Sequence, residues 1–221
     1  MRKLAVFLMV LIVLLVVVDR VAVTGVQRDL ANRIAASADL DGPPTVTIEG
    51  IPFLTQAVSG HYPEVRFDLG TLRYGGVPVK DLQGVAYDVT APLADVIQNR
   101  ADIRAGRLTV RGTLTRATID GYAPKGVKIT GNGQRLVASG ELMVGVNKVK
   151  FNAEMRVQLV DGGILLQAEK IEGVPDQLAR FVSYTIPFKG KLPFDVKVTG
   201  VRSVADGLEF SAEASDVPLR G

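Results

Sequence analysis

Apolar and polar residues alternate with a period of two along most of this chain. In residues 148–160 every second position from Val149 to Leu159 is apolar, and the positions between them are charged or carry amides. The apolar face of this stretch consists of Val149, Phe151, Ala153, Met155, Val157 and Leu159. Such alternation is typical of a strand with one buried face, and a dozen residues is long for a strand. Similar patterns at 107–115, 192–198 and 208–214 predict a sheet-rich protein.

Three short segments depart from this period and predict helices. Each has a proline at its entry and a compact apolar face, which suits a short helix. They are 52–59, ending at Gly60, then 92–100 and 175–184. The predicted fold is therefore α+β, a long curved and mostly antiparallel sheet wrapped on short helices. Many inward positions are small, which leaves room for an elongated lipid-sized cavity, although a fully packed core satisfies the same pattern.

The N-terminus predicts a membrane or export segment. Arg2 and Lys3 precede an unbroken apolar run from Leu4 to Val18. This arrangement is typical of a secretory signal, and no pair of small residues suited to cleavage follows it. We therefore expect a signal anchor, or alternatively a signal peptide, over residues 1–23, and a single β-rich domain over 24–221 on the extracytoplasmic side of the membrane. The spacing of Val23, Val26, Leu30 and Ile34 along one face predicts an amphipathic helix over residues 20–37; the alternative is simply a helix that packs on the domain.

Charge is unevenly distributed along the chain. The formal net charge is only +3, which gives no argument for a nucleic-acid partner. Residues 100–156, however, contain eleven basic and four acidic residues. A basic surface attracts anionic lipid head groups at about 1 kcal/mol per Lys or Arg. Arg104, Arg107 and Arg111 are the head-group candidates, and a solvated sheet face is the alternative.

Motifs for catalysis or metal binding do not emerge from the sequence. It has no Cys and one His, His61, and it lacks a nucleophile elbow, a P-loop and paired catalytic carboxylates. We expect a protein that is not an enzyme and that needs no cofactor or metal.

Several longer stretches resemble a known family. The most specific is "GIPFLTQ" at 50–56, followed by Gly60 and Tyr62; weaker matches are "GTLTRATI" at 112–119, "GVKITGNG" at 126–133 and the stretch 192–219. Together they resemble the actinobacterial LmeA-type phospholipid-binding family over about residues 19–219. The resemblance implies a tubular lipid-binding fold at the outer face of the plasma membrane. It also implies a phospholipid partner, such as a phosphatidylinositol species, and a role in lipoglycan biosynthesis.

Two functions follow from these expectations. The first is an envelope protein that binds or shuttles phospholipid and supports glycolipid or lipoglycan biosynthesis; the alternative is a non-enzymatic scaffold that docks on a membrane glycosyltransferase. Phe53 and Leu54 are expected either to gate the cavity or to form an ordinary hydrophobic corner. The candidate lipid-contacting residues are Phe53, Leu54, Val58, Leu93, Val96, Ile97, Phe151, Met155, Phe181, Val182 and Phe194.

Overall fold

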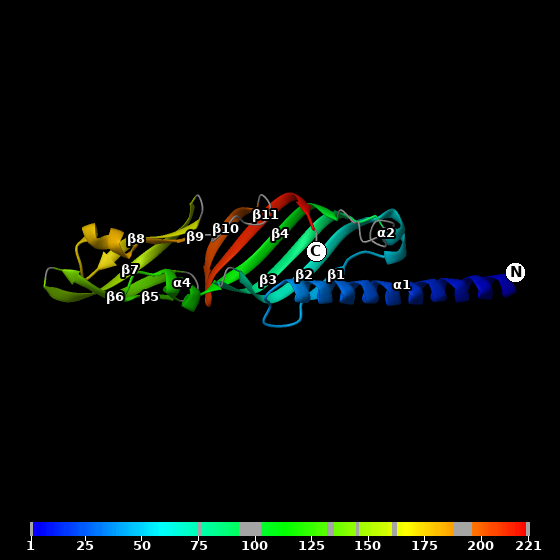
Figure 1. Ribbon diagram of the computed structural model, residues 1–221, viewed down its shortest axis with the longest axis horizontal. Helices are drawn as coiled ribbons and strands as arrows, with labels where there is room; N and C mark the ends of the chain where they lie inside the picture. The colour runs from blue at the N-terminus through cyan, green and yellow to red at the C-terminus, as the bar shows by residue number, and fades with distance from the viewer. Residues whose placement is uncertain are drawn as a thin grey trace. The chain divides into compact units, whose positions relative to one another are not determined.

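The computed structural model describes residues 2–74, 77–92, 103–131, 135–144, 146–160, 163–187 and 196–219. Its helices are α1 (Arg2–Ser37), α2 (Phe53–Ser59), α4 (Arg116–Tyr122), the short 3₁₀ helix η1 (Asp176–Leu178) and α5 (Ala179–Val182). Its strands are β1 (Thr45–Ile48), β2 (His61–Tyr74), β3 (Val77–Thr90), β4 (Arg104–Thr115), β5 (Val127–Gly131), β6 (Leu136–Val144), β7 (Asn147–Val160), β8 (Gly163–Glu172), β9 (Tyr184–Pro187), β10 (Lys197–Val204) and β11 (Gly207–Pro218). Figure 1 shows these elements along the chain.

The strands form two sheets. One has six strands in the order β1-β2-β3-β4-β11-β10, and the other is a five-stranded meander from β5 to β9. The pairs β1–β2 and β10–β11 and every pair of the meander are antiparallel. The predicted α+β fold of mostly antiparallel, curved sheets with short helices is confirmed, with the strands divided between two sheets.

The chain divides into two compact units. Unit 1 comprises residues 1–70, 83–109 and 214–221, and unit 2 comprises residues 71–82 and 110–213. Each is described separately below.

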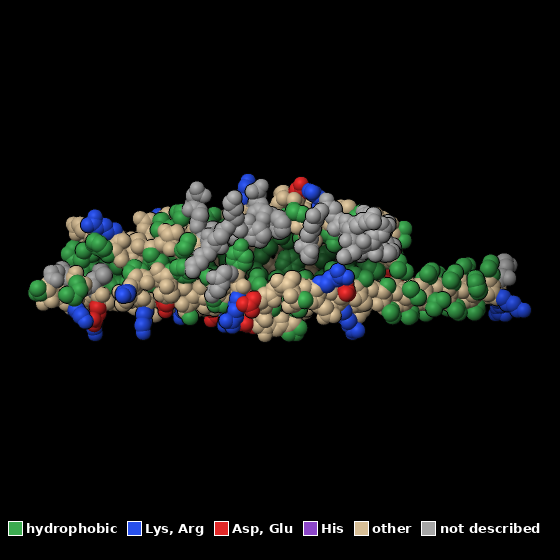
Figure 2. Space-filling view, in the orientation of Figure 1, with side chains coloured by type: hydrophobic (Ala, Val, Ile, Leu, Met, Phe, Trp, Pro, Cys, Tyr) green, Lys and Arg blue, Asp and Glu red, His purple; other side chains and the backbone are tan. Residues whose placement is uncertain are grey.

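In unit 1, α1 is one continuous helix of 36 residues rather than an apolar run followed by a separate helix. It is long and apolar enough to cross a membrane. All the large apolar side chains of residues 4–18 are exposed, and hydrophobic atoms cover this part of the helix in Figure 2. The structure therefore fits the predicted signal anchor.

The C-terminal half of α1 packs on the rest of unit 1. Val23 joins Ile48, Phe53 and Ala57 in a buried cluster, with Ala22 and Leu30 of α1 packed against it. The predicted amphipathic helix therefore packs on the domain. Val26, which the pattern assigned to the buried face, is 39% exposed.

Helix α2 is the short helix expected in the segment 52–59. Pro52 is its N-cap rather than its first helical residue, and Gly60 ends the helix with φ +68°. Glycine adopts this left-handed conformation without the steric penalty of a Cβ atom. The side chain of Pro52 makes no capping hydrogen bond to the first turn of α2. That bond comes from α1, where the carboxylate of Asp19 accepts the backbone N–H of Leu54 at 2.7 Å.

Unit 2 is built on the β5–β9 meander. The strand predicted at 148–160 is β7, and its buried face includes Phe151, Ala153 and Met155. Ile119 of α4 and Val182 of α5 are fully buried in this unit. Helix α4 was not predicted, although Thr115 caps it by accepting the N–H of Thr118, a local signal visible in the sequence "TRAT".

At two inward positions, Gly84 and Gly140, a neighbouring group occupies the space that a larger side chain would need. In unit 1 a Cβ atom on Gly84 would overlap the ring of Phe67. In unit 2 a Cβ atom on Gly140 would overlap the carbonyl oxygen of Gly126 and would lie 3.2 Å from the ring of Phe151. At these two positions a small residue therefore reflects close packing and not free space.

Candidate functional site

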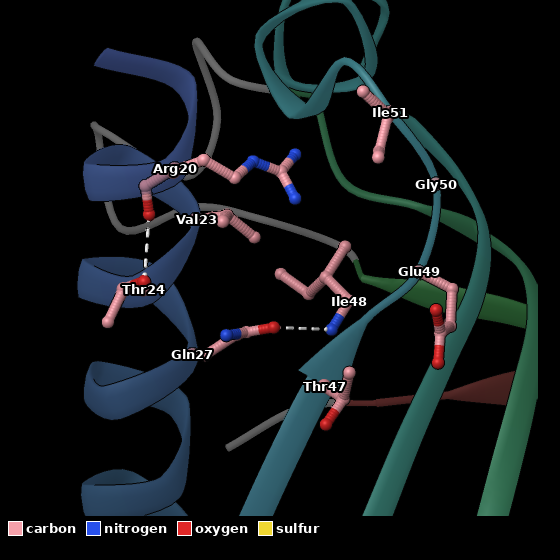
Figure 3. Close-up of a pocket in the computed structure, with 9 residues that line it drawn as sticks. All are labelled: Arg20, Val23, Thr24, Gln27, Thr47, Ile48, Glu49, Gly50 and Ile51. Atoms are coloured by element: carbon pink, nitrogen blue, oxygen red, sulfur yellow. Dashed lines mark hydrogen bonds between the residues drawn. The ribbon is translucent and has the colours of Figure 1, made fainter. Parts of the chain in front are cut away.

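A cavity of about 460 Å³ lies in unit 1 between α1 and the segment formed by β1 and the residues after it. Its lining combines one face of α1 with five consecutive residues, and Figure 3 shows both walls. The lining residues are Arg20, Val23, Thr24, Gln27, Thr47, Ile48, Glu49, Gly50 and Ile51. Cavities of this size are typical of small-molecule sites, so it can hold a head group or another part of a phospholipid.

Helical periodicity places the α1 residues of the cavity on one face. Residues 20, 23, 24 and 27 are spaced three and four apart, which aligns their side chains along the helix. Gln27 fixes the opposite wall, because its Oε1 accepts the backbone N–H of Ile48 at 2.9 Å. Thr24 donates its hydroxyl to the carbonyl of Arg20 at 2.8 Å. The cavity is thus bounded by a helix and a strand that are directly hydrogen-bonded to each other.

Arg20 supplies a positive charge at the cavity. Its side chain is 45% exposed and forms an ion pair with the buried carboxylate of Asp19. In Figure 3 the guanidinium group extends from α1 toward the opposite wall. Glu49 lies on that wall, and its carboxylate is 3.5 Å from the guanidinium of Arg66. Arg20 remains sufficiently open to water to approach an anionic group.

Apolar side chains line the cavity beside these polar groups. Val23 and Ile48 are buried and face each other across it, and Ile51 is 80% exposed. The lining is mixed, with polar side chains at Arg20, Thr24, Gln27, Thr47 and Glu49 and apolar ones at Val23, Ile48 and Ile51. Here a guanidinium group and hydroxyl groups stand next to apolar surface, which matches the two parts of an amphipathic lipid.

The apolar candidates from the sequence lie in different surroundings. Phe53 is buried and Leu54 packs against its cluster, beside the cavity, while Val58 is 81% exposed. Phe151, Met155 and Val182 belong to the buried core of unit 2, whereas Phe181 is 53% exposed under the guanidinium of Arg180. Leu93, Val96, Ile97 and Phe194 lie outside the described residues.

The three head-group candidates each contact a residue of their own unit. The Arg104 guanidinium lies 3.0 and 3.2 Å from the two carboxylate oxygens of Asp216. The Arg107 guanidinium lies 4.6 Å above the ring centre of Tyr87. Arg111 lies 3.8 Å from the carboxylate of Glu209. All three residues are exposed, so a lipid head group would compete with these contacts.

Other basic residues of the 100–156 block pair across the strands of unit 2. Arg135 lies 3.1 Å from Glu154, and Arg156 forms an ion pair with Glu169. These contacts fit the alternative that this part of the block is a solvated sheet face.

Arg20, Thr24 and Gln27 were not among the candidates from the sequence. The available signal was their spacing on one face of the helix that follows the apolar run. Asp19 and Arg20 directly follow that run, where Asp19 is buried and Arg20 lines the cavity.

The described residues contain no group of three or more His, Asp or Glu side chains that could hold a metal ion. His61 is half exposed and lies 3.9 Å from a carboxylate oxygen of Asp88. Tyr62 packs against Phe53 with ring centres 6.1 Å apart, and burial raises the pKa of its phenol. The burial of Tyr62 therefore favours the uncharged phenol within the apolar cluster.

Comparison with known proteins places the chain in one family. No curated protein and no solved structure gives a match. The model of the LmeA-like phospholipid-binding family matches residues 17–213, which include the cavity, Asp19 and all of α2. This match covers most of the chain, and the chain therefore belongs to the LmeA-like phospholipid-binding family.

Proposed function

We propose that this protein is exported, stays attached to the plasma membrane through the apolar part of α1, and binds phospholipid on the extracytoplasmic side. The cavity beside Arg20 is the proposed binding site for part of that lipid. The observation that carries the proposal is the continuity of α1, because one helix supplies both the exposed apolar run and a wall of the cavity. Membership in a phospholipid-binding family favours a binding role over catalysis.

The packing of α1 supports retention of the N-terminal segment. Asp19 and Val23 are both buried, and Asp19 supplies the hydrogen bond to the first turn of α2. Cleavage after residue 23 would remove both residues from unit 1. We therefore expect the intact mass of protein from the native envelope to include residues 1–23, whereas a mature N-terminus beyond Val23 would contradict the anchor.

In the cell this lipid binding would serve lipid shuttling or the biosynthesis of envelope glycolipids and lipoglycans. A phosphatidylinositol species is the proposed ligand. The alternative, a scaffold docked on a membrane glycosyltransferase, needs no bound lipid.

Native mass spectrometry of the full chain released from membranes tests the binding site. The wild type should retain phospholipid of a defined stoichiometry and head group. Thr47→Trp should reduce that occupancy because Thr47 lines the cavity, where a larger side chain would fill the space. Thr45→Trp is the matched control, on the same face of β1 and outside the lining.

The outcomes of this experiment separate the alternatives. Equal lipid occupancy in both variants would place the lipid elsewhere in the protein. A stable complex with another membrane protein and without phospholipid would favour the scaffold.

A further inference from the structure

The position of α2 along α1 is fixed by a hydrogen bond. The exposed apolar run ends at Val18, and the next residue, Asp19, accepts the N–H of Leu54 at 2.7 Å. The first turn of α2 therefore lies level with the end of the apolar run. If the run spans the bilayer, α2 lies where the hydrocarbon core meets the head groups.

The segment Ile51–Ser59 exposes apolar side chains at this level. Ile51 and Val58 are 80% and 81% exposed, although Phe53 and Ala57 of the same segment are buried. The segment contains no charged residue. Its exposed hydroxyls bond within it, Thr55 to the carbonyl of Pro52 and Ser59 to that of Gln56, both at 2.9 Å. Its transfer from water into the interfacial layer therefore meets no cost of desolvating a charge.

The cavity shares this level with the segment. In Figure 3 Arg20 and Ile51 lie at the end of the cavity nearest the apolar run, and Gln27 and Thr47 lie toward the other end. Arginine can keep its charge among head groups while its stem contacts apolar surface. A guanidinium and an exposed isoleucine at one end match the phosphate and the upper acyl region of a lipid in the bilayer.

We propose that Ile51–Ser59 inserts into the interfacial layer of the bilayer beside α1, with Ile51 and Val58 in contact with lipid. The cavity then opens toward the leaflet, and a phospholipid enters it without crossing water. This inference rests on the proposed function, because it requires α1 to be a membrane anchor. The bilayer is the one occupant that also covers the exposed apolar run on the same helix.

The chain has no cysteine, so single-cysteine labelling can test the insertion directly. A small environment-sensitive fluorophore is attached at Ile51→Cys, at Val10→Cys in the apolar run, and at Ala36→Cys as control. Ala36 is exposed on α1, about 25 Å along the helix beyond Asp19 at 1.5 Å per residue. The full chain is reconstituted in phosphatidylcholine–phosphatidylglycerol vesicles that contain lipids with a nitroxide at a shallow or a deep acyl position.

We expect quenching at positions 10 and 51 but not at 36. The shallow nitroxide should quench position 51 more than the deep one, and the deep nitroxide should be more effective at position 10. Quenching at 10 with no more at 51 than at 36 overturns the insertion and leaves the anchor intact. Absence of quenching at both 10 and 51 overturns the anchor and the insertion together.

An unlabelled variant guards against insertion driven by the fluorophore. Replacement of Ile51 and Val58 by Ser should slow lipid uptake from vesicles several-fold without unfolding, because both side chains are exposed. Thr55→Ser, on the same short helix, is the control and should leave the rate unchanged. Uptake by the double variant at the wild-type rate, together with an unquenched label at position 51, would rule out a lipid-facing segment.

Discussion

Phe53 in unit 1 and Phe151 in unit 2 are both buried aromatic residues, but their surroundings differ. Phe151 lies on β7, a strand that pairs with both β6 and β8, and it is buried in a unit whose core includes Leu136, Ile164 and Leu166. Phe53 begins a helix of seven residues and packs in a small cluster against α1, next to a cavity and two exposed apolar side chains. Apolar character alone thus does not separate a structural core from a lipid-contacting region.

The largest expected effect concerns these two residues. Phe151→Ala should lower the free energy of unfolding by about 3–5 kcal/mol, the usual loss for a buried phenylalanine. Phe53→Ala should cost about 3 kcal/mol, at the lower end, because its small cluster borders open space and can relax. Chemical unfolding of lipid-free protein, measured beside lipid binding in the cold, tests both. A Phe53→Ala variant that is fully stable but has lost lipid would show instead that Phe53 gates the cavity.

The close packing of unit 2 can be tested at Gly140. Gly140→Ala should cost about 1–3 kcal/mol, because its Cβ would overlap the carbonyl oxygen of Gly126 and meet the ring of Phe151. Gly200→Ala on β10 is the control, since a Cβ there would have no atom within 4 Å. Thermal unfolding should show a loss only for Gly140→Ala. Equal stabilities would indicate more space around Phe151 than the structure shows.

Within unit 1, the contact between helices α1 and α2 depends on Asp19. Asp19→Ala should cost about 1 kcal/mol, as does the loss of a capping side chain, because the N–H of Leu54 loses its acceptor. Asp19→Asn keeps an oxygen acceptor and should largely restore the wild-type behaviour. Hydrogen exchange at the Leu54 amide is the measurement. If this amide exchanges at the same rate in all three proteins, Asp19 does not hold α2 on α1.

Replacing single arginines should have the smallest effect on stability. These variants are nevertheless the most informative about lipid binding. Arg20→Gln should weaken anionic-lipid binding roughly fivefold relative to phosphatidylcholine, which corresponds to about 1 kcal/mol for one charge. Arg104→Gln should change it less, because Arg20 lines the cavity and Arg104 does not. Added salt should reduce the difference between lipids. A greater loss in a variant lacking Arg104, Arg107 and Arg111 would place the head group at β4 instead.

Local signals in the sequence were sufficient for much of the fold. The two-residue alternation identified β7 and β4, and proline and glycine delimited α2 within one residue. The apolar run marked the exposed half of α1. These features depend on neighbours a few positions away, which is why periodicity and capping residues could reveal them. Helix α4 has a similar capping signal in Thr115, but this residue also ends the alternating pattern of β4, which obscures the start of the helix.

The candidate site was decided by contacts between distant residues. Asp19 binds an amide 35 positions away, and Arg104 meets a carboxylate 112 positions away. The side chains of Arg20 and Ile51 reach one cavity only because α1 packs beside β1. The sequence by itself determined which residues are apolar, charged or small. Only the tertiary structure decided which of them meet, because the packing of whole elements sets these distances and the local pattern does not contain them.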